Sequence, residues 1–460
     1  MGRIFGTDGV RGVANEKLDV ELTLAISRAA GMVIKAEGKA RPQILVGRDT
    51  RLSGTMLEAA ACAGLTSVGC DVIRLGVVPT PAVAYLVPKL GTDGGMMITA
   101  SHNPFAYNGI KYFGSTGFKL TDEQEDRIER IVLDNAEPTV LASAEEIGRI
   151  SDEPEAVNVY AAHIASAVGD LSGLRIAVDC ANGASSAVAR KIFAKANADA
   201  VYYNDVPDGV NVNKECGSLF IENLGKTVRE NGFDLGVAFD GDADRCLAVD
   251  ETGSVMDGDV IMAILAKRLS DEGRLNKNMF IPTVMSNMGL FKFAEENGMT
   301  CLPTKVGDRY VLENMLKFDA SLGGEQSGHV IFREFMTTGD GELTGLLLAD
   351  TLKRSGKKAS ELRKVMTTYP QVMINIEATA EMKKNLDTPE VKTYLDIEDK
   401  RLDDGRILVR PSGTEPLIRI MVEGRDEKKI RTVVSECAET LKTLLREKEV
   451  VTDEIFERLD

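Results

Sequence analysis

Apolar runs that end in short polar loops recur along this chain, and their spacing is the strongest constraint on its fold. Three rounds of the pattern begin at Gln43–Val46, Leu174–Ser185 and Met279–Asn287. In each round a second apolar run follows roughly 40–60 residues later and ends in another polar loop, a spacing compatible with an internal repeat. We therefore expect three similar α/β/α domains with mixed, mainly parallel sheets.

The C-terminal segment follows a different pattern. Val372–Thr379, Gly405–Pro416 and Leu417–Gly424 are strand-like, and a long amphipathic helix comes after them. The apolar face of this helix holds Ile430, Val433, Val434, Cys437, Leu441, Leu444 and Leu445. This segment is predicted to be an α+β domain in which a helix closes a sheet.

Four domains around a central active-site cleft are expected, because 460 residues exceed the size at which one hydrophobic core keeps growing. The predicted domains are 1–154, 155–256, 257–368 and 369–460. The expected linkers lie near Ser151–Pro154, Met256–Asp259 and Tyr369–Pro370.

The charge and the cysteines limit the class of protein. A formal net charge of −16 argues against nucleic acid and anionic membranes as partners. The seven cysteines form no C-x-x-C pair, so a reducing cytoplasm is the expected location. No apolar run approaches the roughly 20 residues that span a bilayer, which predicts a soluble protein.

The loop "FDGDADR", Phe239 to Arg245, places three carboxylates within five residues. Asp240, Asp242 and Asp244 could together hold one hard divalent cation through oxygen. An EF-hand is excluded because its sixth position, which needs glycine, holds Arg245, and because the flanks are strand-like. The competing interpretation is a solvated acidic turn, which the mutual repulsion of the carboxylates disfavours.

The loop "TASHNP", Thr99 to Pro104, places Ser101 where an apolar strand ends. Ligands of parallel α/β sheets bind at the carboxyl ends of the strands. A serine hydrolase is disfavoured because G-x-S-x-G is missing and the adjacent His102 is poorly placed as a base. From its own residues, this loop favours a turn that merely ends a strand over a catalytic serine.

Two further loops carry groups that bind polar ligands. In "GGEQSGH", Glu325 and Ser327 would suit a polyol or an amino sugar, although a structural turn fits equally well. In "RPSGTEPLIR", guanidinium, hydroxyl and backbone N–H donors form a phosphate cradle, unless the loop is only a hairpin turn. Together the four loops predict phosphoryl transfer, which depends on positioning and charge neutralisation.

In their order and spacing, these four loops resemble the signature loops of the α-D-phosphohexomutase superfamily. The resemblance covers nearly the whole chain, from "GRIFGTDGVRG" to "LIRIMVEG". The chain is most similar to the phosphoglucosamine mutase branch, through "FGTDGVRG", "NGIKYFGSTGFKL", "TVMSN" and "VGDRYV". It departs from that branch at Ala243, where glycine is usual, and in the run after Cys216-Gly217-Ser218.

The resemblance implies a role for each site residue. Ser101 would carry the phosphoryl group and, with Asp240, Asp242 and Asp244, would bind one Mg²⁺. Arg245 and His102 would neutralise charge, and Arg11 would contact the substrate or the phosphoserine. Lys111 would be the general acid/base, with a pKa lowered by burial and by other cations. Asp308, Arg309, Glu325 and Ser327 would face the sugar, and the second phosphate would be held by Arg410, Ser412, Gly413, Thr414 and Arg419.

The implied reaction interconverts glucosamine 6-phosphate and glucosamine 1-phosphate, with a 1,6-bisphosphate as intermediate. Glucosamine or glucose 1,6-bisphosphate would serve as activator, and the sequence leaves open whether the chain forms a homodimer. The same chemistry on another hexose would make the chain a phosphomannomutase or a phosphoglucomutase. An aspartyl-phosphate phosphatase that uses Asp240, or a catalytically dead sugar-phosphate sensor, would be a different class of protein with the same loops.

Overall fold

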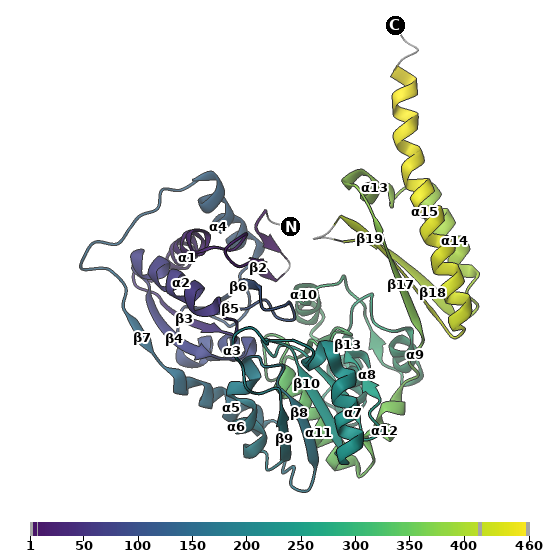
Figure 1. The fold of residues 1–460 in the computed structure, drawn as a ribbon, viewed down its shortest axis with the longest axis horizontal. Coiled ribbons are helices and arrows are strands. Elements are labelled where there is room, and N and C mark those ends of the chain that lie inside the picture. Colours follow the sequence, from purple (N-terminus) through teal and green to yellow (C-terminus); the bar gives the residue numbers. More distant parts are fainter. Residues whose placement is uncertain (1–2, 7, 413–415, 457–460) are drawn as a thin grey trace. The chain divides into compact units, whose positions relative to one another are not determined.

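The computed structural model describes residues 3–6, 8–412 and 416–456, with side chains described as far as Arg446. The chain divides into two compact units (Figure 1). The larger unit comprises Met1–Val284 and Asn297–Val365, and the smaller comprises Met285–Glu296 and Met366–Asp460. No helix within the described ranges is both long and apolar enough to cross a membrane.

The first sheet of the larger unit has seven strands. Its elements are β1 Phe5–Gly6, β2 Gly9–Val13, α1 Val20–Lys35, β3 Gln43–Arg48, α2 Gly54–Ser67, β4 Asp71–Val77, α3 Thr80–Leu90, β5 Gly94–Ile98, β6 Tyr107–Gly114, α4 Asp122–Asp134 and β7 Ile150–Asp152. The strand order is β1-β2-β6-β5-β3-β4-β7, with parallel pairing from β5 to β7 and antiparallel pairing from β1 to β5. Every residue of β5 is buried, as expected for a strand covered on both faces.

The expected linker near Ser151–Pro154 begins within a strand, because Ser151 and Asp152 belong to β7. This short, exposed strand pairs in parallel with β4 at the edge of the first sheet. An ion pair joins Asp152 to Arg74 of β4 at 2.7 Å. Pairing at a solvated edge requires no hydrophobic pattern, so the residues themselves gave no strand signal.

The second and third sheets are smaller. The second region contains α5 Val157–Ser166, β8 Arg175–Asp179, α6 Ala189–Lys195, β9 Asp199–Tyr203, α7 Ile221–Asn231, β10 Leu235–Phe239, β11 Cys246–Asp250 and β12 Val255–Met256, in the sheet order β12-β11-β10-β8-β9. The third contains α8 Gly258–Asp271, β13 Met279–Ile281, β14 Thr300–Cys301, α10 Asp308–Phe318, β15 Leu322–Gly324, β16 Val330–Phe332, α11 Gly341–Ser355 and α12 Ala359–Leu362, in the order β14-β13-β15-β16. Both sheets are mixed, with a parallel part and an antiparallel edge.

The three sheets share one feature that places the polar loops. In each, a strand of the parallel set turns back through a hairpin into an antiparallel neighbour: β5 into β6, β10 into β11 and β15 into β16. The loops with Ser101, the three aspartates and Glu325 are these hairpin connections. The mixed α/β architecture is confirmed, and in each of the three sheets one antiparallel strand begins at a polar loop.

The smaller unit contains a three-stranded antiparallel sheet. Its elements are α9 Met288–Glu296, β17 Gln371–Glu377, α13 Ala380–Asn385, α14 Pro389–Lys400, β18 Gly405–Pro411, β19 Leu417–Gly424 and α15 Glu427–Phe456, and the strand order is β17-β19-β18. The predicted closing helix is α15, which lies along the sheet (Figure 1). It buries Ile430, Val433, Cys437 and Leu441 against Ile418 and Ile420 in the core of the unit.

The helix α9 belongs to this smaller unit although its sequence precedes β14. The Met288 amide donates to Oε1 of Glu423 at 3.0 Å, and Asn287 Nδ2 donates to the Tyr369 carbonyl at 2.9 Å. These contacts hold the segment Met285–Glu296 against the C-terminal sheet.

Candidate active site

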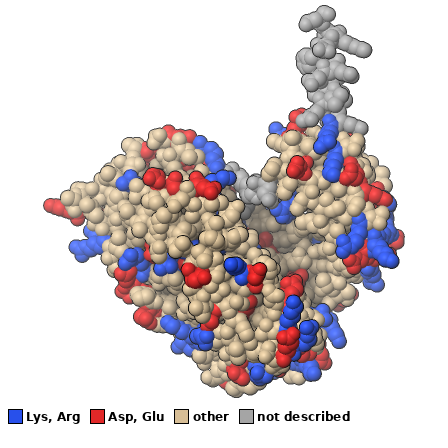
Figure 2. Space-filling view, in the orientation of Figure 1, with Lys and Arg blue, Asp and Glu red and all other residues tan. Residues whose placement is uncertain are grey.

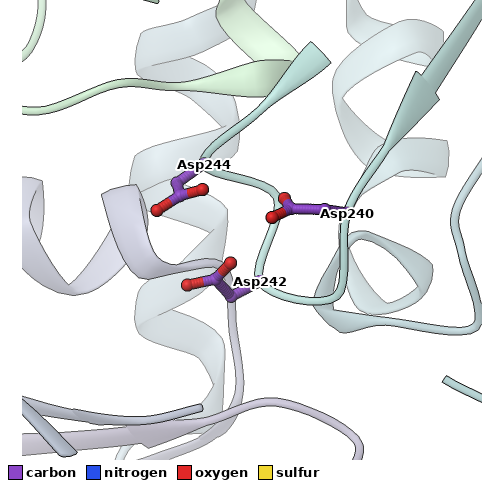
Figure 3. Close-up of side chains that lie close together, drawn as sticks. All are labelled: Asp240, Asp242 and Asp244. Atoms are coloured by element: carbon purple, nitrogen blue, oxygen red, sulfur yellow. The ribbon is translucent and has the colours of Figure 1, made fainter. Parts of the chain in front are cut away.

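Three aspartates converge in the β10–β11 loop of the larger unit. Asp240, Asp242 and Asp244 are buried, and one oxygen of each lies within 4.8 Å of the others. Figure 3 shows the three side chains turned toward one another. Ala243, between two of them, has a φ of 56°, in the left-handed region that favours glycine. The alanine at this position therefore keeps a strained backbone conformation, which costs some free energy.

The chemistry of this cluster fits a divalent cation. Burial and the charges of Asp244 and Asp242 raise the pKa of Asp240 to about 8. Oδ1 of Asp242 and Oδ1 of Asp244 are buried and have no hydrogen-bond partner within the described part of the chain. Unpaired buried carboxylate oxygens are costly, and a hard cation bound by oxygen removes that cost.

Ser101 of the β5–β6 loop reaches this cluster from the first domain. Its Oγ donates to Oδ2 of Asp240 at 2.7 Å, and the serine is 1% exposed. Its φ of 51° is left-handed, which is uncommon for a residue with a side chain. The structure thus brings the predicted phosphate carrier and the predicted metal ligands together.

His102 lies beside the serine, in surroundings that disfavour a positive charge on its imidazole. Its Nδ1 is 3.2 Å from Ser101 Oγ. Burial, followed by the charges of Arg245 and Arg11, lowers the pKa of His102 to about 4. A neutral imidazole can offer a phosphoryl group only a hydrogen bond, so neutralisation of charge by His102 stays a prediction.

Lys111 of β6 also departs from the expected electrostatics. Its Nζ is 2.9 Å from Asp242, 3.1 Å from Asp244 and 3.0 Å from Asp8. Burial by itself lowers the pKa of a lysine, but these three carboxylates raise the pKa of Lys111 well above its ordinary value. The predicted lowering is wrong because the sequence did not show how many carboxylates surround the ammonium group.

Two arginines complete the charged surroundings of the loop. Nε of Arg245 is 3.9 Å from Asp240 and 3.8 Å from Asp244, and these carboxylates raise its pKa against the effect of burial. Arg11 of β2 forms an ion pair with Asp8. Both guanidinium groups lie close enough to His102, the neighbour of the predicted phosphoryl carrier, to lower its pKa.

The third domain contributes residues from the β15–β16 loop. Oε1 of Glu325 accepts a hydrogen bond from the Gly307 amide at 3.1 Å, and Ser327 is exposed. His329 was not assigned a role from the sequence, yet its Nδ1 is 3.7 Å from Asp244. Burial lowers the pKa of this histidine, but hydrogen bonding and charge from Asp244 outweigh it and raise the pKa.

A charged bridge connects the first and third domains next to this site. Lys119 pairs with both Asp8 and Asp308. Arg309, at the start of α10, donates to Glu125 at 2.9 Å and to the Leu120 carbonyl at 3.1 Å. The structure therefore places Asp308 and Arg309 in ion pairs. Lys119 received no role from the sequence, because it is recognisable only from its neighbours in space.

The predicted phosphate cradle lies at the β18–β19 hairpin of the smaller unit. Arg410 and Arg419 are paired residues on these strands, which places two positive side chains directly opposite each other. Like charges in that position destabilise a sheet, so an anion between them would be favourable. Ser412 is buried, and Lys383 donates to its carbonyl at 2.7 Å. Gly413 and Thr414 lie outside the described residues.

The charges on the visible face of the molecule are interspersed. Figure 2 shows Asp and Glu side chains alternating with Lys and Arg over that face. A mixture of this kind suits an acidic protein that binds a small anion through a few local basic groups.

Sequence models of the phosphoglucomutase/phosphomannomutase family match four successive segments. Alpha/beta/alpha domains I, II and III match residues 2–139, 158–253 and 257–369, and the C-terminal domain matches 370–440. The chain belongs to this family.

The phosphoglucosamine mutase of Acetivibrio thermocellus is 52% identical to the chain over 93% of its length and 96% of that protein. A phosphoglucomutase/phosphomannomutase family protein from Burkholderia thailandensis has a similar structure, with a TM-score of 0.81, 25% identity and coverage of 96% of this chain and 98% of that one. The N-acetylphosphoglucosamine mutase of Aspergillus fumigatus, solved with GlcNAc-6P and magnesium, has a TM-score of 0.67 at 16% identity and covers 96% and 95%. These relatives support a phosphomutase, an isomerase.

Proposed function

We propose that this enzyme interconverts glucosamine 6-phosphate and glucosamine 1-phosphate through a phosphoserine at Ser101. The observation that carries the proposal is the 2.7 Å hydrogen bond from Ser101 Oγ to Asp240, which joins loops of two domains. The identity of 52% to a phosphoglucosamine mutase over nearly the whole chain supports the substrate. The Aspergillus fumigatus structure shows that the same fold accommodates an amino sugar phosphate and magnesium.

Asp240, Asp242 and Asp244 would hold one Mg²⁺ together with the phosphate on Ser101. The buried oxygens of the cluster fit this role, because Mg²⁺ commonly combines protein carboxylates with phosphate oxygens. A bound Mg²⁺ would neutralise negative charge on the phosphoryl group.

The reaction consists of two phosphoryl transfers. In the first, the bond from phosphorus to Ser101 Oγ breaks as a bond to O1 of glucosamine 6-phosphate forms, which gives the 1,6-bisphosphate. After the intermediate has turned, Ser101 Oγ attacks the phosphorus on O6, and glucosamine 1-phosphate leaves. O1 loses one proton and O6 gains one, and we assign this transfer to Nζ of Lys111. The carboxylates of Asp242 and Asp244 keep this Nζ protonated, and a bound Mg²⁺ would neutralise them and so favour the neutral amine that accepts the proton.

The remaining residues would bind the substrate. Arg11 and Arg245 face the transferred group, and His102 offers it a hydrogen bond. Asp308, Arg309, Glu325 and Ser327 contact the sugar, with the carboxylate of Glu325 suited to an ammonium at C2. Arg410, Ser412, Gly413, Thr414 and Arg419 hold the phosphate that does not react, from a fourth domain that begins at residue 369. The other domain boundaries we propose are 1–154, 155–256 and 257–368, and glucosamine or glucose 1,6-bisphosphate would activate the enzyme.

Turnover of three hexose phosphates tests the proposal. Protein of known Ser101 phosphorylation is assayed with glucosamine, mannose and glucose 6-phosphates in the presence of Mg²⁺. We expect the highest kcat/KM with glucosamine 6-phosphate and a severe loss in Ser101→Ala. Much faster turnover of mannose 6-phosphate would instead assign a phosphomannomutase, and phosphate on Asp240 rather than Ser101 would assign a phosphatase mechanism.

A further inference from the structure

Arg51 is a fully buried arginine that none of the four polar loops contains. It follows β3, it is 1% exposed, and its Nε is 2.8 Å from Oδ2 of Asp49. Its two terminal nitrogens point into the β5–β6 loop, where they donate to the carbonyl oxygens of Ser101 at 2.9 Å, Asn103 at 2.8 Å, Pro104 at 2.6 Å and Tyr107 at 3.0 Å. One guanidinium group therefore binds most of the loop that carries the serine.

The same ion pair also holds the amide side of the serine. The Ser101 amide donates to Oγ1 of Thr99 at 2.9 Å, and Thr99 Oγ1 donates to Oδ2 of Asp49 at 2.7 Å. The N–H and the C=O of Ser101 are thus both tied to the Asp49–Arg51 pair.

The second domain holds the loop from the other side. Asn213 Nδ2 donates to the Ser101 carbonyl at 2.9 Å and to the Asn103 carbonyl at 3.3 Å. Gly241, in the aspartate loop, packs so closely that a Cβ there would lie 2.5 Å from the Ser101 carbonyl oxygen. The serine loop is therefore fixed relative to the carboxylates as well as within its own domain.

This network explains how Ser101 keeps its conformation. A left-handed backbone is strained for a residue with a side chain, and it persists only where surrounding contacts require it. We propose that Arg51 is a positioning residue for phosphoryl transfer, which fixes Ser101 Oγ against the aspartate loop with the help of Asn213. The role rests on the proposed function of Ser101. A displacement of about 1 Å in a reacting group can cost about 10²-fold in rate.

Arg51→Lys tests this role, because lysine keeps the charge and loses the planar fork that binds four carbonyl groups. The matched control is Arg268→Lys. Arg268 is also largely buried and donates to Asp350 at 2.7 Å and to the Leu347 carbonyl at 3.2 Å, and these partners lie outside the candidate site. Both variants lose a buried guanidinium group, so both are expected to lower the thermal midpoint.

The kinetics separate positioning from stability. Each protein is phosphorylated with glucose 1,6-bisphosphate and assayed with glucosamine 6-phosphate and Mg²⁺. We expect kcat of Arg51→Lys to fall roughly 10–100-fold with KM within about 2-fold, and kcat of Arg268→Lys to stay within about 2-fold of the wild type. Equal kcat values for Arg51→Lys and the wild type would overturn the positioning role, as would equal losses in the two variants.

Asn213→Ala provides a second test that leaves Arg51 in place. If Arg51→Lys does not fold, Asn213→Ala is still expected to lower kcat by roughly 3–10-fold without a change in KM. An unchanged kcat in Asn213→Ala would contradict the proposal. A phosphorylated wild-type protein without activity on glucosamine 6-phosphate would overturn the proposed function itself, and with it the role of Arg51.

Discussion

Individual buried carboxylates behave differently in this protein according to the partners that surround them. Asp242 lies beside Lys111 and Thr80, and its remaining oxygen points into the candidate metal site. Glu342 is equally buried in the first turn of α11, but neither of its oxygens has a hydrogen-bond partner among the described residues. The first carboxylate is available as a metal ligand, whereas the second only costs stability.

Thr80→Val is predicted to weaken metal binding without contact to the metal. Oγ1 of Thr80 donates to Oδ2 of Asp242 at 2.5 Å, and partners that orient a ligand typically contribute 10–100-fold to affinity or activity. We expect a loss of about 10-fold or more in Mg²⁺ affinity, measured as the Mg²⁺ dependence of kcat/KM. Thr66→Val is the control, because Oγ1 of Thr66 donates to carbonyls of its own helix, α2. Equal Mg²⁺ dependence in the two variants would contradict the prediction.

Glu342→Leu is predicted to stabilise the protein increasingly as the pH rises. Burial, together with Asp340, raises the pKa of Glu342 well above its ordinary value of 4.5. Above about pH 4.5, Glu342 loses its proton in the unfolded chain but keeps it in the folded chain. The stability of the wild type therefore falls as the pH rises from 4.5 to the pKa of Glu342 in the folded protein. Removal of the unpaired carboxyl is worth about 1–3 kcal/mol.

Thermal midpoints of the wild type and Glu342→Leu between pH 5 and pH 8 measure this effect. We expect the difference between the two proteins to widen toward pH 8. Parallel midpoint profiles would show that Glu342 is paired in solution.

At the scale of elements, each of the four polar loops connects the two antiparallel strands of a hairpin. The strands before the loops are visible in the sequence as apolar runs, whereas the antiparallel return strands are short or less regular. In the β18–β19 hairpin the strand register sets Arg410 against Arg419. This opposition gives the cradle its charge, and it follows from pairing rather than from spacing along the chain.

Arg410→Gln is predicted to weaken substrate binding through the phosphate that does not react. A hydrogen bond to a charged group contributes roughly 1.5–3 kcal/mol, which corresponds to a rise in KM of about 10–100-fold. KM for glucosamine 6-phosphate measures the effect, with Arg431→Gln as control, because the exposed Arg431 pairs with Glu427 of its own helix. A KM that rises equally in both variants would argue against the cradle.

At the scale of the whole molecule, the chain forms two compact units with separate cores. The C-terminal sheet and α15 share one core, and α9 joins that unit from an earlier part of the sequence. The candidate metal site lies entirely within the larger unit. A ligand that binds the larger unit and a mutation in the core of the smaller unit can therefore shift two separate unfolding transitions.

We predict that calorimetry will show two separate unfolding transitions, one for each unit. Leu441 is 0% exposed, and Leu441→Ala costs about 2–5 kcal/mol, so it should lower the transition of the smaller unit. Mg²⁺ binds only the folded larger unit in our proposal and should raise the other transition by linkage. A single transition that shifts as a whole with both changes would show that the units unfold together.

The sequence by itself determined the repeated α/β units, the C-terminal α+β domain and the residue types at the polar loops. Periodic burial and strand-end polarity are local properties, so they can be read along the chain. Ser101 and the three aspartates lie together, as the family resemblance implied, although their loops follow strands of two different sheets.

Only the tertiary structure decided the protonation of the site and the support of its serine. The pKa of Lys111 is raised and that of His102 is lowered by groups that lie far away in the sequence. Arg51 lies 50 residues before Ser101 in the sequence and Asn213 lies in another domain, yet both donate hydrogen bonds to the Ser101 carbonyl. Charge and hydrogen bonding act through space over a few ångströms, and the distances that set them exist only after the chain has folded.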